Sequence, residues 1–571
     1  MKNSNDVNLS WTLSAVASHT TPAATPSYGN HRFIASTQHD VAPRPKPRRG
    51  SRAFPVLDHD QRHASAAFEH GPLVKPRFSR LHRAFEFQAN AHPKAVAVEH
   101  AGRSVLYAEL NRQADVIASV LIEHGVKPGD AVGLFLRRSI PMVVGILATL
   151  KAGAAYVPQD TKVAPANLLN QVIEQSKARI ILTTSDQASA IPDHDGCSVL
   201  AIDRLLAEPK ANIINSPAFQ RTGTDDRCFI LFTSGTTGKP NGVEVTHQNV
   251  ANIILTAPGD LNIRPGRKVA QLLNIGFDMA AWEILGCLTN GGTLLIRGGD
   301  MTETASRADV IIATPSILGG IDAARCRRAK TVAVAGEPCP RPLADKWAAF
   351  CTFYNSCGPT ETTIVNTMKR HHPDAERLTI GRPTPNNAVY VLGEDLQPVA
   401  FGKVGVMWAG GDCVTAGYIG NPDLTAERYR PDPFLGGGRM MFNTRDLGRW
   451  TKDGELEHLG RVDDQVKIRG FRVELDSVST IIETVDGCDK AIALKFDDRH
   501  LIAFVSPAHV KIGEAYEAMA RNLPYYCKPL MVIGMDELPK TNRGKIDKRR
   551  LLDIAKREHE RQSGETREIV A

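Results

Sequence analysis

A strand–helix–strand pattern in residues 131–158 constrains the fold of this chain more than any other feature. The apolar run at 131–136 is typical of a buried strand, residues 140–151 have the apolar spacing of a helix, and residues 155–158 form a second short apolar run. Two strands joined by a helical crossover lie parallel in one sheet. The pattern therefore predicts an α/β fold built on parallel sheets.

A second series of predicted strands follows between residues 269 and 355. Apolar runs at 310–313, 331–335 and 352–355 each end in a polar turn. In an open parallel sheet, ligands bind beyond the carboxyl ends of the strands. We therefore expect three turns to face one crevice, at residues 313–316, 335–338 and 355–361.

A loop of small residues opens from another predicted buried strand at residues 229–232. Gly235 and Gly238 allow the backbone to take positive φ and to approach an anion closely. Hydroxyl donors lie beside them, namely Thr233, Ser234, Thr236 and Thr237. The loop is not a Walker loop, because Thr233 stands where that motif requires its first glycine. A solvated Ser/Thr/Gly linker is the alternative for this loop considered alone.

Length and composition indicate a multidomain globular protein. The chain has 571 residues, of which 42% are hydrophobic and 23% charged. No apolar run approaches the ~20 residues that span a bilayer. Ten cysteines without regular spacing favour a reducing compartment, with the cytoplasm as the default. The densest part of the +7 net charge lies in a Pro-rich arm at residues 43–52, so we expect neither a nucleic-acid nor a membrane partner.

We predict four segments along the chain. A basic extension rich in Pro and Ser is expected to be disordered, and a large core, a small mobile α+β lid and a short tail follow it. The core combines the parallel sheets with a small β-barrel, because short strands with Gly and Pro turns follow residue 392. The boundaries are 1–78 for the extension, 79–459 for the core, 460–555 for the lid and 556–571 for the tail.

Two local patterns are specific enough to be tested by a structure. Apolar spacing predicts a helix that starts within residues 104–110 and continues to Leu121. In the lid, residues 491–496 and 501–505 flank an Asp-Asp-Arg turn and predict a β-hairpin.

Nine stretches, in order along residues 80–552, together resemble the adenylation domains of nonribosomal peptide synthetases. That family belongs to a superfamily with the acyl-CoA synthetases and luciferases. The matching stretches are residues 150–158 with Asp160, 233–242, Phe277 and Asp278 with Trp282 and Glu283, 355–361, 416–418, Thr444 with 446–447, 460–474, 523–524 and 544–547.

The resemblance implies an ATP-dependent enzyme that works in two steps. A carboxylate attacks the α-phosphate of ATP and releases pyrophosphate, and a thiol then captures the acyl-adenylate as a thioester. The implied cofactors are ATP, Mg²⁺ and a phosphopantetheine thiol. Since no Gly-Gly-x-Ser attachment site appears in this sequence, we expect that thiol on a separate carrier protein acting in trans, or else a trimmed or truncated synthetase.

The resemblance also assigns roles at the nucleotide. Lys545 is the main catalytic cation, Glu361 the magnesium carboxylate, Asp446 the ribose ligand and Arg461 its neighbour near ribose or phosphate, while Asp463 is the hinge of the lid. The other expected ATP contacts are Thr233, Ser234, Gly235, Thr236, Thr237, Gly238, Gly336, Glu337, Asn355, Ser356, Cys357 and Thr360. Considered alone, Lys545 is typical of a solvated surface lysine and Glu361 of a helix start.

Asp278 indicates the class of substrate. In the amino-acid-activating members of the family, the matching carboxylate holds the α-ammonium of the substrate, although Asp278 alone is also typical of a helix cap. The resemblance places eight residues along the side-chain pocket: Met279, Trp282, Ala313, Ala333, Ala335, Ser356, Ile364 and Val365. Because four are small and the others apolar, we expect a large uncharged amino acid, aromatic or aliphatic.

Three positions depart from the family pattern. Asn241 replaces a lysine of the phosphate loop, Cys357 replaces the ring that stacks on adenine, and Arg445 replaces a glycine before the ribose aspartate. Tyr354 is the nearest alternative ring for adenine. Arg445 is expected to be strained if the turn requires positive φ. Two other functions therefore stay open, an acid:CoA ligase and a non-catalytic nucleotide-binding homologue.

Overall fold

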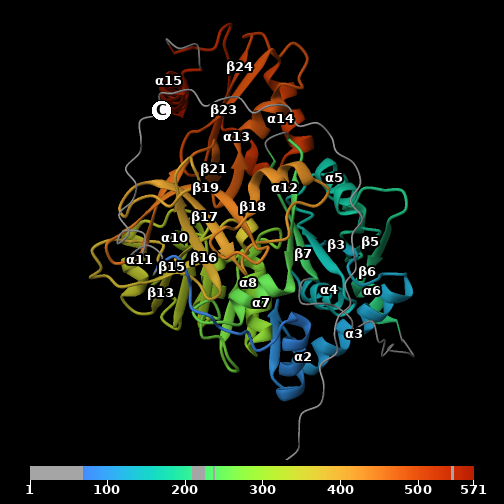
Figure 1. Ribbon diagram of the computed structural model, residues 1–571. Helices are drawn as coiled ribbons and strands as arrows, with labels where there is room; N and C mark the ends of the chain where they lie inside the picture. The colour runs from blue at the N-terminus through green and yellow to red at the C-terminus, as the bar shows by residue number, and fades with distance from the viewer. Residues whose placement is uncertain (1–67, 209–225, 236–237, 542–545, 571) are drawn as a thin grey trace, which may run out of the picture. The chain divides into compact units, whose positions relative to one another are not determined.

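The computed structural model describes residues 68–208, 226–235, 238–541 and 546–570, with side chains up to residue 561 (Figure 1). Most of the predicted extension therefore lies outside the described residues. Residues 69–74, which we assigned to it, contact the core, because His70 forms a β-bridge with Ala388 and the Gly71 amide donates to the Asn387 carbonyl at 2.8 Å. The four segment boundaries stay predictions.

The first predicted strand–helix–strand unit lies in a six-stranded sheet. β3 (Ala131–Phe135) and β4 (Ala155–Gln159) are parallel and joined by α4 (Ile140–Lys151), as expected. Ser139 caps α4 by accepting from the Met142 amide at 3.2 Å, and every residue of α4 except Pro141 is buried. The sheet order is β6-β5-β3-β4-β7-β8, with β5 (Ile180–Thr183), β6 (Ser198–Ala201), β7 (Arg227–Thr233) and β8 (Asn241–Thr246).

The second series forms a nine-stranded sheet of order β15-β14-β13-β12-β11-β9-β10-β1-β2. Its parallel centre contains β9 (Lys268–Gln271), β10 (Thr293–Ile296), β11 (Val310–Ala313), β12 (Thr331–Val334) and β13 (Thr352–Cys357). β1 (Val96–His100) pairs parallel with β10 and extends this centre, and antiparallel strands flank it, namely β2 (Arg103–Leu106), β14 (Thr367–His371) and β15 (Arg382–Pro383). The predicted parallel series is confirmed.

The helix expected to start within residues 104–110 begins at Tyr107, as α3 (Tyr107–Glu123). The three residues before it, Ser104 to Leu106, belong instead to β2, which pairs antiparallel with β1. That strand satisfies its backbone groups through a tertiary partner, which outweighs the local helical spacing.

The remaining helices of the N-terminal part cover the sheets (Figure 1). They are α2 (Leu81–Ala91), α5 (Ala166–Ser176), α6 (Ile202–Ala207), α7 (His247–Ile254), α8 (Asp278–Thr289), α9 (Met301–Ser306), α10 (Pro315–Gly319), α11 (Arg341–Ala348) and α12 (Pro422–Arg428), with 3-10 turns at η1 (Ala188–Ala190) and η3 (Thr360–Thr362).

The β-rich segment predicted after residue 392 forms a five-stranded antiparallel sheet. It contains β16 (Asn387–Leu392), β17 (Gly405–Gly411), β18 (Tyr429–Pro431), β19 (Met440–Trp450) and β20 (Leu456–Arg461). The chain thus combines two large, mainly parallel sheets with an antiparallel one, and the predicted α/β fold class is confirmed.

The C-terminal lobe, residues 460–561, begins with a hairpin of β21 (Gln465–Ile468) and β22 (Phe471–Glu474). The predicted second hairpin is also present, as β23 (Lys490–Lys495) and β24 (Leu501–Ser506), and β25 (Val532–Gly534) joins its edge. The helical elements are α13 (Leu475–Ile482), α14 (Ile512–Asn522), η4 (Tyr525–Cys527) and α15 (Lys548–Val570).

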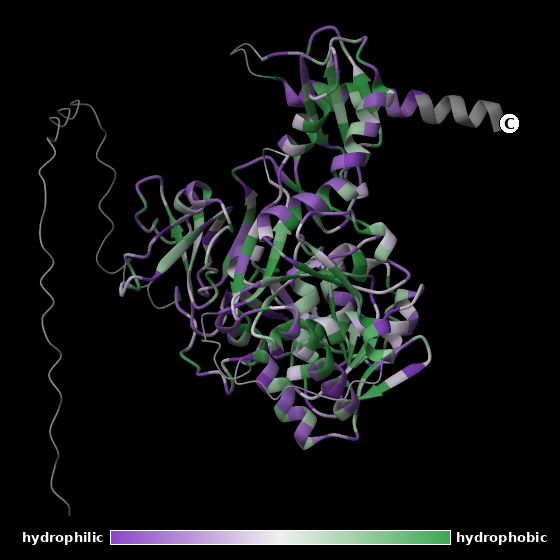
Figure 2. Cartoon of the chain, turned by 90° about the vertical axis from the view of Figure 1, so that its right-hand side faces the viewer, coloured by the Kyte–Doolittle hydropathy of each residue, from purple (hydrophilic) through white to green (hydrophobic). Residues whose placement is uncertain are grey.

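Apolar residues of the sheets and of α4 and α8 form the largest core, and the strands are coloured mainly as hydrophobic in Figure 2. The ammonium of Lys151, on α4, is buried there. The Lys151 ammonium lies 2.7 Å from both Glu86 and Asp115, which compensates its desolvation. Among the described helices, none combines the length and apolar character needed to cross a membrane.

Candidate active site

A cavity of about 1320 Å³ opens where the two large sheets meet the hairpin β21–β22. Each of the three strand-end turns predicted to share a crevice contributes to its wall, for example through Thr314, Glu337 and Asn355. The loop after β7 contributes Thr233, Ser234, Gly235 and Gly238, and the hairpin contributes Lys467 and Arg472. The predicted crevice therefore exists.

The backbone of the loop after β7 is tightly packed at Gly235 and has positive φ at Gly238, as we expected for these two glycines. A Cβ on Gly235 would lie 2.1 Å from the Lys239 carbonyl oxygen, and Gly238 has φ +79°. The Thr233 hydroxyl donates to the Asn241 carbonyl at 3.3 Å, so the residue that replaces the family's lysine supports the loop through its backbone. Thr236 and Thr237 lie outside the described residues.

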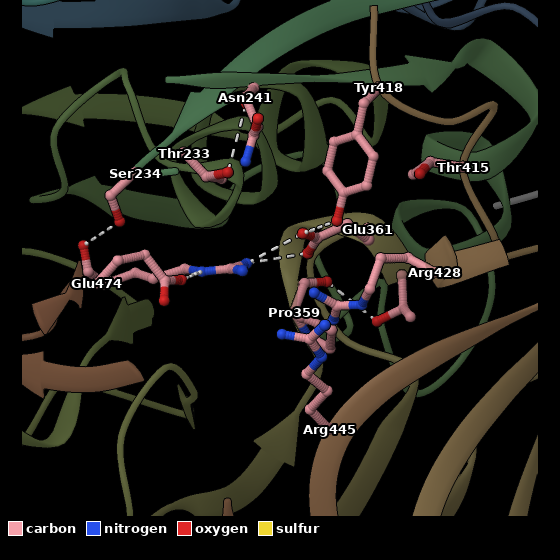
Figure 3. Close-up of polar contacts among 12 residues, drawn as sticks. Thr233, Ser234, Asn241, Pro359, Glu361, Thr415, Tyr418, Arg428, Arg445 and Glu474 are labelled. Atoms are coloured by element: carbon pink, nitrogen blue, oxygen red, sulfur yellow. Dashed lines mark hydrogen bonds and ion pairs between the residues drawn. The ribbon is translucent and has the colours of Figure 1, made fainter. Parts of the chain in front are cut away.

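Glu361, in η3, is fully buried and fully engaged (Figure 3). The Tyr418 hydroxyl donates to its Oε1 at 2.7 Å, and the Arg472 Nη1 donates to Oε1 and Oε2 at 3.1 and 3.0 Å. Burial alone would raise the pKa of Glu361, but the charges of Arg472 and Arg428 outweigh it and lower that pKa to about 2. Glu361 is therefore an ionised, compensated carboxylate.

A magnesium ion does not fit this arrangement of Glu361. Mg²⁺ requires oxygen ligands at ~2.0–2.1 Å in octahedral geometry. Both carboxylate oxygens already accept from the Arg472 guanidinium, and within the described part of the chain no group of three or more His, Cys, Asp or Glu side chains could hold a metal. Metal binding at Glu361 would require Arg472 to leave.

Asp446 and Arg461, both assigned to the nucleotide, form an ion pair at 2.6 Å in the cavity wall. Arg461 also donates to both oxygens of the predicted hinge, Asp463, at 2.7 and 2.9 Å. Burial would raise the pKa of Asp463, yet the hydrogen bonds and charge of Arg461 lower it overall. The same guanidinium thus links a predicted ribose ligand to the predicted hinge.

Arg445 has φ +59°, so the position does require the left-handed conformation that a glycine adopts without strain. Its guanidinium forms a short ion pair with Glu427 and lies 3.8 Å from Asp463. The expected backbone strain is confirmed.

Asp278 is buried at the start of α8 and lines the cavity. Its Oδ1 accepts from the Met279 amide at 2.7 Å. Burial raises the pKa of Asp278 to about 6, against the opposing charge of Lys467 and a hydrogen bond from Thr360. Lys467 belongs to β21, so the C-terminal lobe places a cation near the carboxylate that we assigned to the substrate.

The predicted pocket residues divide into two groups. Met279, Ser356 and Ile364 line the cavity, and the buried Ser356 hydroxyl has no hydrogen-bond partner among the described residues. Trp282 is fully buried in the core, where its Nε1 donates to the Gly259 carbonyl at 2.6 Å. Four others, Ala313, Ala333, Ala335 and Val365, are buried in the core and are not part of the cavity wall.

The remaining nucleotide contacts that we expected all lie along the cavity: Gly336, Glu337, Asn355, Cys357 and Thr360. Glu337 accepts from the Ser316 amide and hydroxyl at 2.8 and 2.9 Å, and the Asn355 side chain donates to the Thr379 carbonyl at 2.8 Å. Tyr354 is not in the cavity wall, so it does not supply the ring that Cys357 lacks.

Lys545 lies outside the described residues. On either side of it, Lys540 and Ile546 form a β-bridge, and Lys548 pairs with Asp464 at 2.5 Å, while none of these three lines the cavity. The lobe instead contributes Lys467 and Arg472 to the cavity wall, and sequence analysis did not single out either residue. The available signal was the cluster of basic residues within the matching stretch 460–474, at positions 467, 469 and 472.

Comparison with known proteins shows the family of this chain. A family model described as AMP-binding enzyme matches residues 85–419, more than half of the chain. The chain belongs to the AMP-binding enzyme family. Within it, this AMP-binding enzyme is similar in sequence to adenylate-forming reductases and to nonribosomal peptide synthetases.

Two curated relatives are similar to this AMP-binding enzyme over most of its length. It is 47% identical over 482 residues to adenylate-forming reductase 06235 of Coprinopsis cinerea, covering 84% of this chain and 47% of the relative. It is 33% identical to nonribosomal peptide synthetase sirP of Leptosphaeria maculans, covering 84% of this chain and 22% of that protein. The chain thus spans less than half the length of these two relatives.

The fold of this AMP-binding enzyme matches solved adenylation domains. An artificially fused adenylation–PCP di-domain from Klebsiella oxytoca has a TM-score of 0.71 at 23% identity, covering 81% of this chain and 94% of that one. At this identity the likeness concerns the fold alone.

Proposed function

We propose that this enzyme activates an amino acid with a large uncharged side chain as its aminoacyl-adenylate, releasing pyrophosphate, and passes it to a phosphopantetheine thiol on a carrier protein. The observation that carries the proposal is Asp278, a buried carboxylate in the cavity wall. Because an ionised carboxylate in such a site requires a cation, the site favours a substrate that brings an ammonium group.

The nucleotide is proposed to lie between the loop after β7 and the Asp446–Arg461 pair. Gly235 lets backbone amides approach the phosphates, and Asp446 offers an acceptor for ribose hydroxyls. Lys545 is proposed to neutralise charge at the α-phosphate once the lobe turns about Asp463. The Mg²⁺ that accompanies ATP is expected at Glu361 when Arg472 is withdrawn.

A carrier protein in trans is proposed as the acceptor. The similarity to a nonribosomal peptide synthetase and to an artificially fused adenylation–PCP di-domain supports this partner. A cytoplasmic location is part of the same proposal, and the ten cysteines, all free in the structure, support it.

A second candidate is the activation of an acid that lacks the amino group. Two observations favour it: Lys467 already provides a positive charge near Asp278, and a relative at 47% identity is named an adenylate-forming reductase. An activated acid of this kind would pass to coenzyme A, as in an acid:CoA ligase, or to a carrier for reduction.

Exchange of labelled pyrophosphate into ATP separates these candidates. The purified chain is assayed with each of the twenty amino acids and with matched carboxylic acids that lack the amino group. Exchange only with amino acids supports the first proposal. If the Asp278→Asn variant no longer prefers amino acids over the amino-free acids, the role of that carboxylate is supported. Exchange only with the amino-free acids establishes the second candidate, and exchange with neither class rules out both.

A further inference from the structure

The Ser356 hydroxyl, in the wall of the cavity, has no hydrogen-bond partner among the described residues, although the residue is only 4% exposed. Two other residues of the wall have an orphaned buried polar atom, Arg297 at Nε and Gln465 at Oε1, but each has further polar atoms on the same side chain. In serine the hydroxyl is the whole polar part. Because a buried hydroxyl without a partner is unfavourable, Ser356 is the residue of this wall that most needs a partner from a ligand.

Ser356 lies on the α8 side of β13. Side chains alternate between the two faces of a strand. Tyr354, two residues earlier, packs against the largest core cluster, which contains Met279 of α8, whereas Cys357 packs against the cluster that contains Ile380. The side of Ser356 is therefore that of Met279, next to the carboxylate assigned to the substrate. The other side is that of Cys357, which was expected at adenine. The hydroxyl thus belongs to the acid end of the cavity.

The surroundings of Ser356 on this side are apolar. The register of β12 and β13 places Ala335 beside it. Ala335, Met279 and Ile364 belong to one apolar cluster, and the last two line the cavity. A Cβ on Gly336 would lie 3.7 Å from Met279 Sδ, so the methionine packs against the end of β12. None of these side chains offers a strong donor or acceptor to a hydroxyl.

Ile364 is held on this wall by a strained backbone. Thr363 and Ile364 have φ +54° and +69°, in the left-handed region that β-branched residues rarely adopt. The Thr363 hydroxyl donates to the Cys413 carbonyl at 2.8 Å, and the Val365 amide donates to the Thr363 carbonyl at 2.8 Å. Such conformations persist where the surrounding contacts impose them, and they gather at ligand sites. The apolar wall at this end of the cavity is therefore fixed before a ligand binds.

We propose that Ser356 is a specificity-determining residue whose hydroxyl hydrogen-bonds a polar group on the side chain of the acid. The substrate is then an acid whose mainly apolar side chain carries a hydroxyl, phenol or amide group, and not a pure hydrocarbon. This inference rests on the proposed function, which assigns this end of the cavity to the acid, and it narrows the uncharged side chain named there. Because serine both donates and accepts, either kind of polar group satisfies it, whereas a hydrocarbon leaves it unpaired.

The test uses pairs of acids that differ by one polar group. Pyrophosphate exchange is measured for tyrosine against phenylalanine, for threonine against valine, and for para-hydroxyphenylpropanoate against phenylpropanoate, which lack the amino group. In the pair that supports exchange best, the polar member should have a kcat/KM at least about tenfold higher, because its analogue leaves the hydroxyl unpaired.

Substitutions of Ser356 connect this preference to the hydroxyl. Ser356→Ala should bring the ratio of the two kcat/KM values to within about twofold of one. Ser356→Thr keeps a hydroxyl and should retain the preference for the polar member. Ser189→Ala removes an exposed serine of η1, outside the cavity wall, and is the matched control that should leave the ratio unchanged.

Calorimetric binding of the acyl-sulfamoyl-adenosine analogues of the same pair gives a readout without turnover. The wild type should bind the polar analogue at least about tenfold tighter, and Ser356→Ala should bind both equally. A preference for the apolar member, or one that survives in Ser356→Ala, would overturn the proposal. So would a Ser356→Ala effect confined to the KM of ATP, which would place the hydroxyl on the nucleotide. Failure of exchange with every acid would instead reject the proposed function, and the binding ratio would still decide the role of Ser356.

Discussion

At the scale of single residues, Asp278 shows how burial changes the chemistry of a carboxylate. Its position at the start of α8 is common for a helix-capping aspartate, but its pKa is raised from 3.8 to about 6 because the side chain is desolvated. Since the folded protein binds its proton more tightly than the unfolded chain, ionised Asp278 costs folding free energy at neutral pH. An ammonium group bound beside it would recover part of that cost.

This shift predicts how substrate affinity depends on pH. Below about pH 6 Asp278 becomes neutral and no longer balances an ammonium, so we expect the KM of the amino acid to be about tenfold higher at pH 5 than at pH 7. Steady-state pyrophosphate exchange across this range measures it. The slope should disappear in Asp278→Asn, and a pH-independent KM in the wild type would contradict the assignment.

Arg445 predicts a gain in stability on removal of its side chain. The positive φ of Arg445 destabilises the folded state by about 1 kcal/mol. Its ion pair with Glu427, which is mostly exposed, offsets little of this destabilisation. Arg445→Gly should therefore raise the free energy of unfolding by about 0.5–1 kcal/mol in urea denaturation. Arg445→Ala, which loses the pair but keeps the strained backbone, is the control and should show no gain.

At the scale of elements, the local sequence pattern predicted the helices and strands that are buried on all sides. The bounds of α4 match the predicted helix, and β11 matches the predicted strand at 310–313, because apolar periodicity alone specifies a fully buried element. The start of α3 was predicted only to within residues 104–110, and the structure places it at Tyr107 because residues 103–106 pair with β1 as β2. Cys357 and the loop glycines were found from their motifs, but Arg472 was not, because its partner is 111 residues away.

The loop after β7 carries a prediction of its own. A Cβ on Gly235 would lie 2.1 Å from the Lys239 carbonyl, so Gly235→Ala must rearrange the loop. We expect a drop of at least about tenfold in pyrophosphate exchange, mainly through the KM of ATP, as the backbone amides move from the phosphates. Gly298→Ala, where an added Cβ meets nothing within 4 Å, is the matched control and should exchange normally.

At the scale of the whole molecule, the C-terminal lobe turns its hairpin toward the cavity, while Lys540 and Ile546, which flank the predicted catalytic lysine, pair with each other away from the cavity wall. Among the described residues of the lobe, the hairpin therefore lines the cavity and these two flanking residues do not. A rotation of the lobe about Asp463 is proposed to bring Lys545 to the cavity in place of the hairpin.

Lys545 should therefore matter for one half-reaction only. Lys545→Ala is expected to reduce adenylate formation at least ~10²-fold, the size typical of removing one transition-state donor. Transfer of a preformed adenylate to a thiol should be nearly unaffected, as measured by single-turnover thioester formation. Lys556→Ala, an exposed lysine on α15, is the control, and a near-normal adenylation rate in Lys545→Ala would contradict the role.

The interior of the C-terminal lobe is packed within itself. In the described chain, its main apolar cluster draws on Ile468 to Val532 and a second on Leu494 to Ala555, whereas the largest cluster of the core ends at Phe442. Because these apolar interiors are separate, we expect the lobe and the core to melt separately, although the Phe277 and Phe471 rings are in contact between them, with centroids 5.0 Å apart. A calorimetric trace should accordingly contain two endotherms, and protease added between them should release an intact, nucleotide-free core fragment that has lost its second half-reaction.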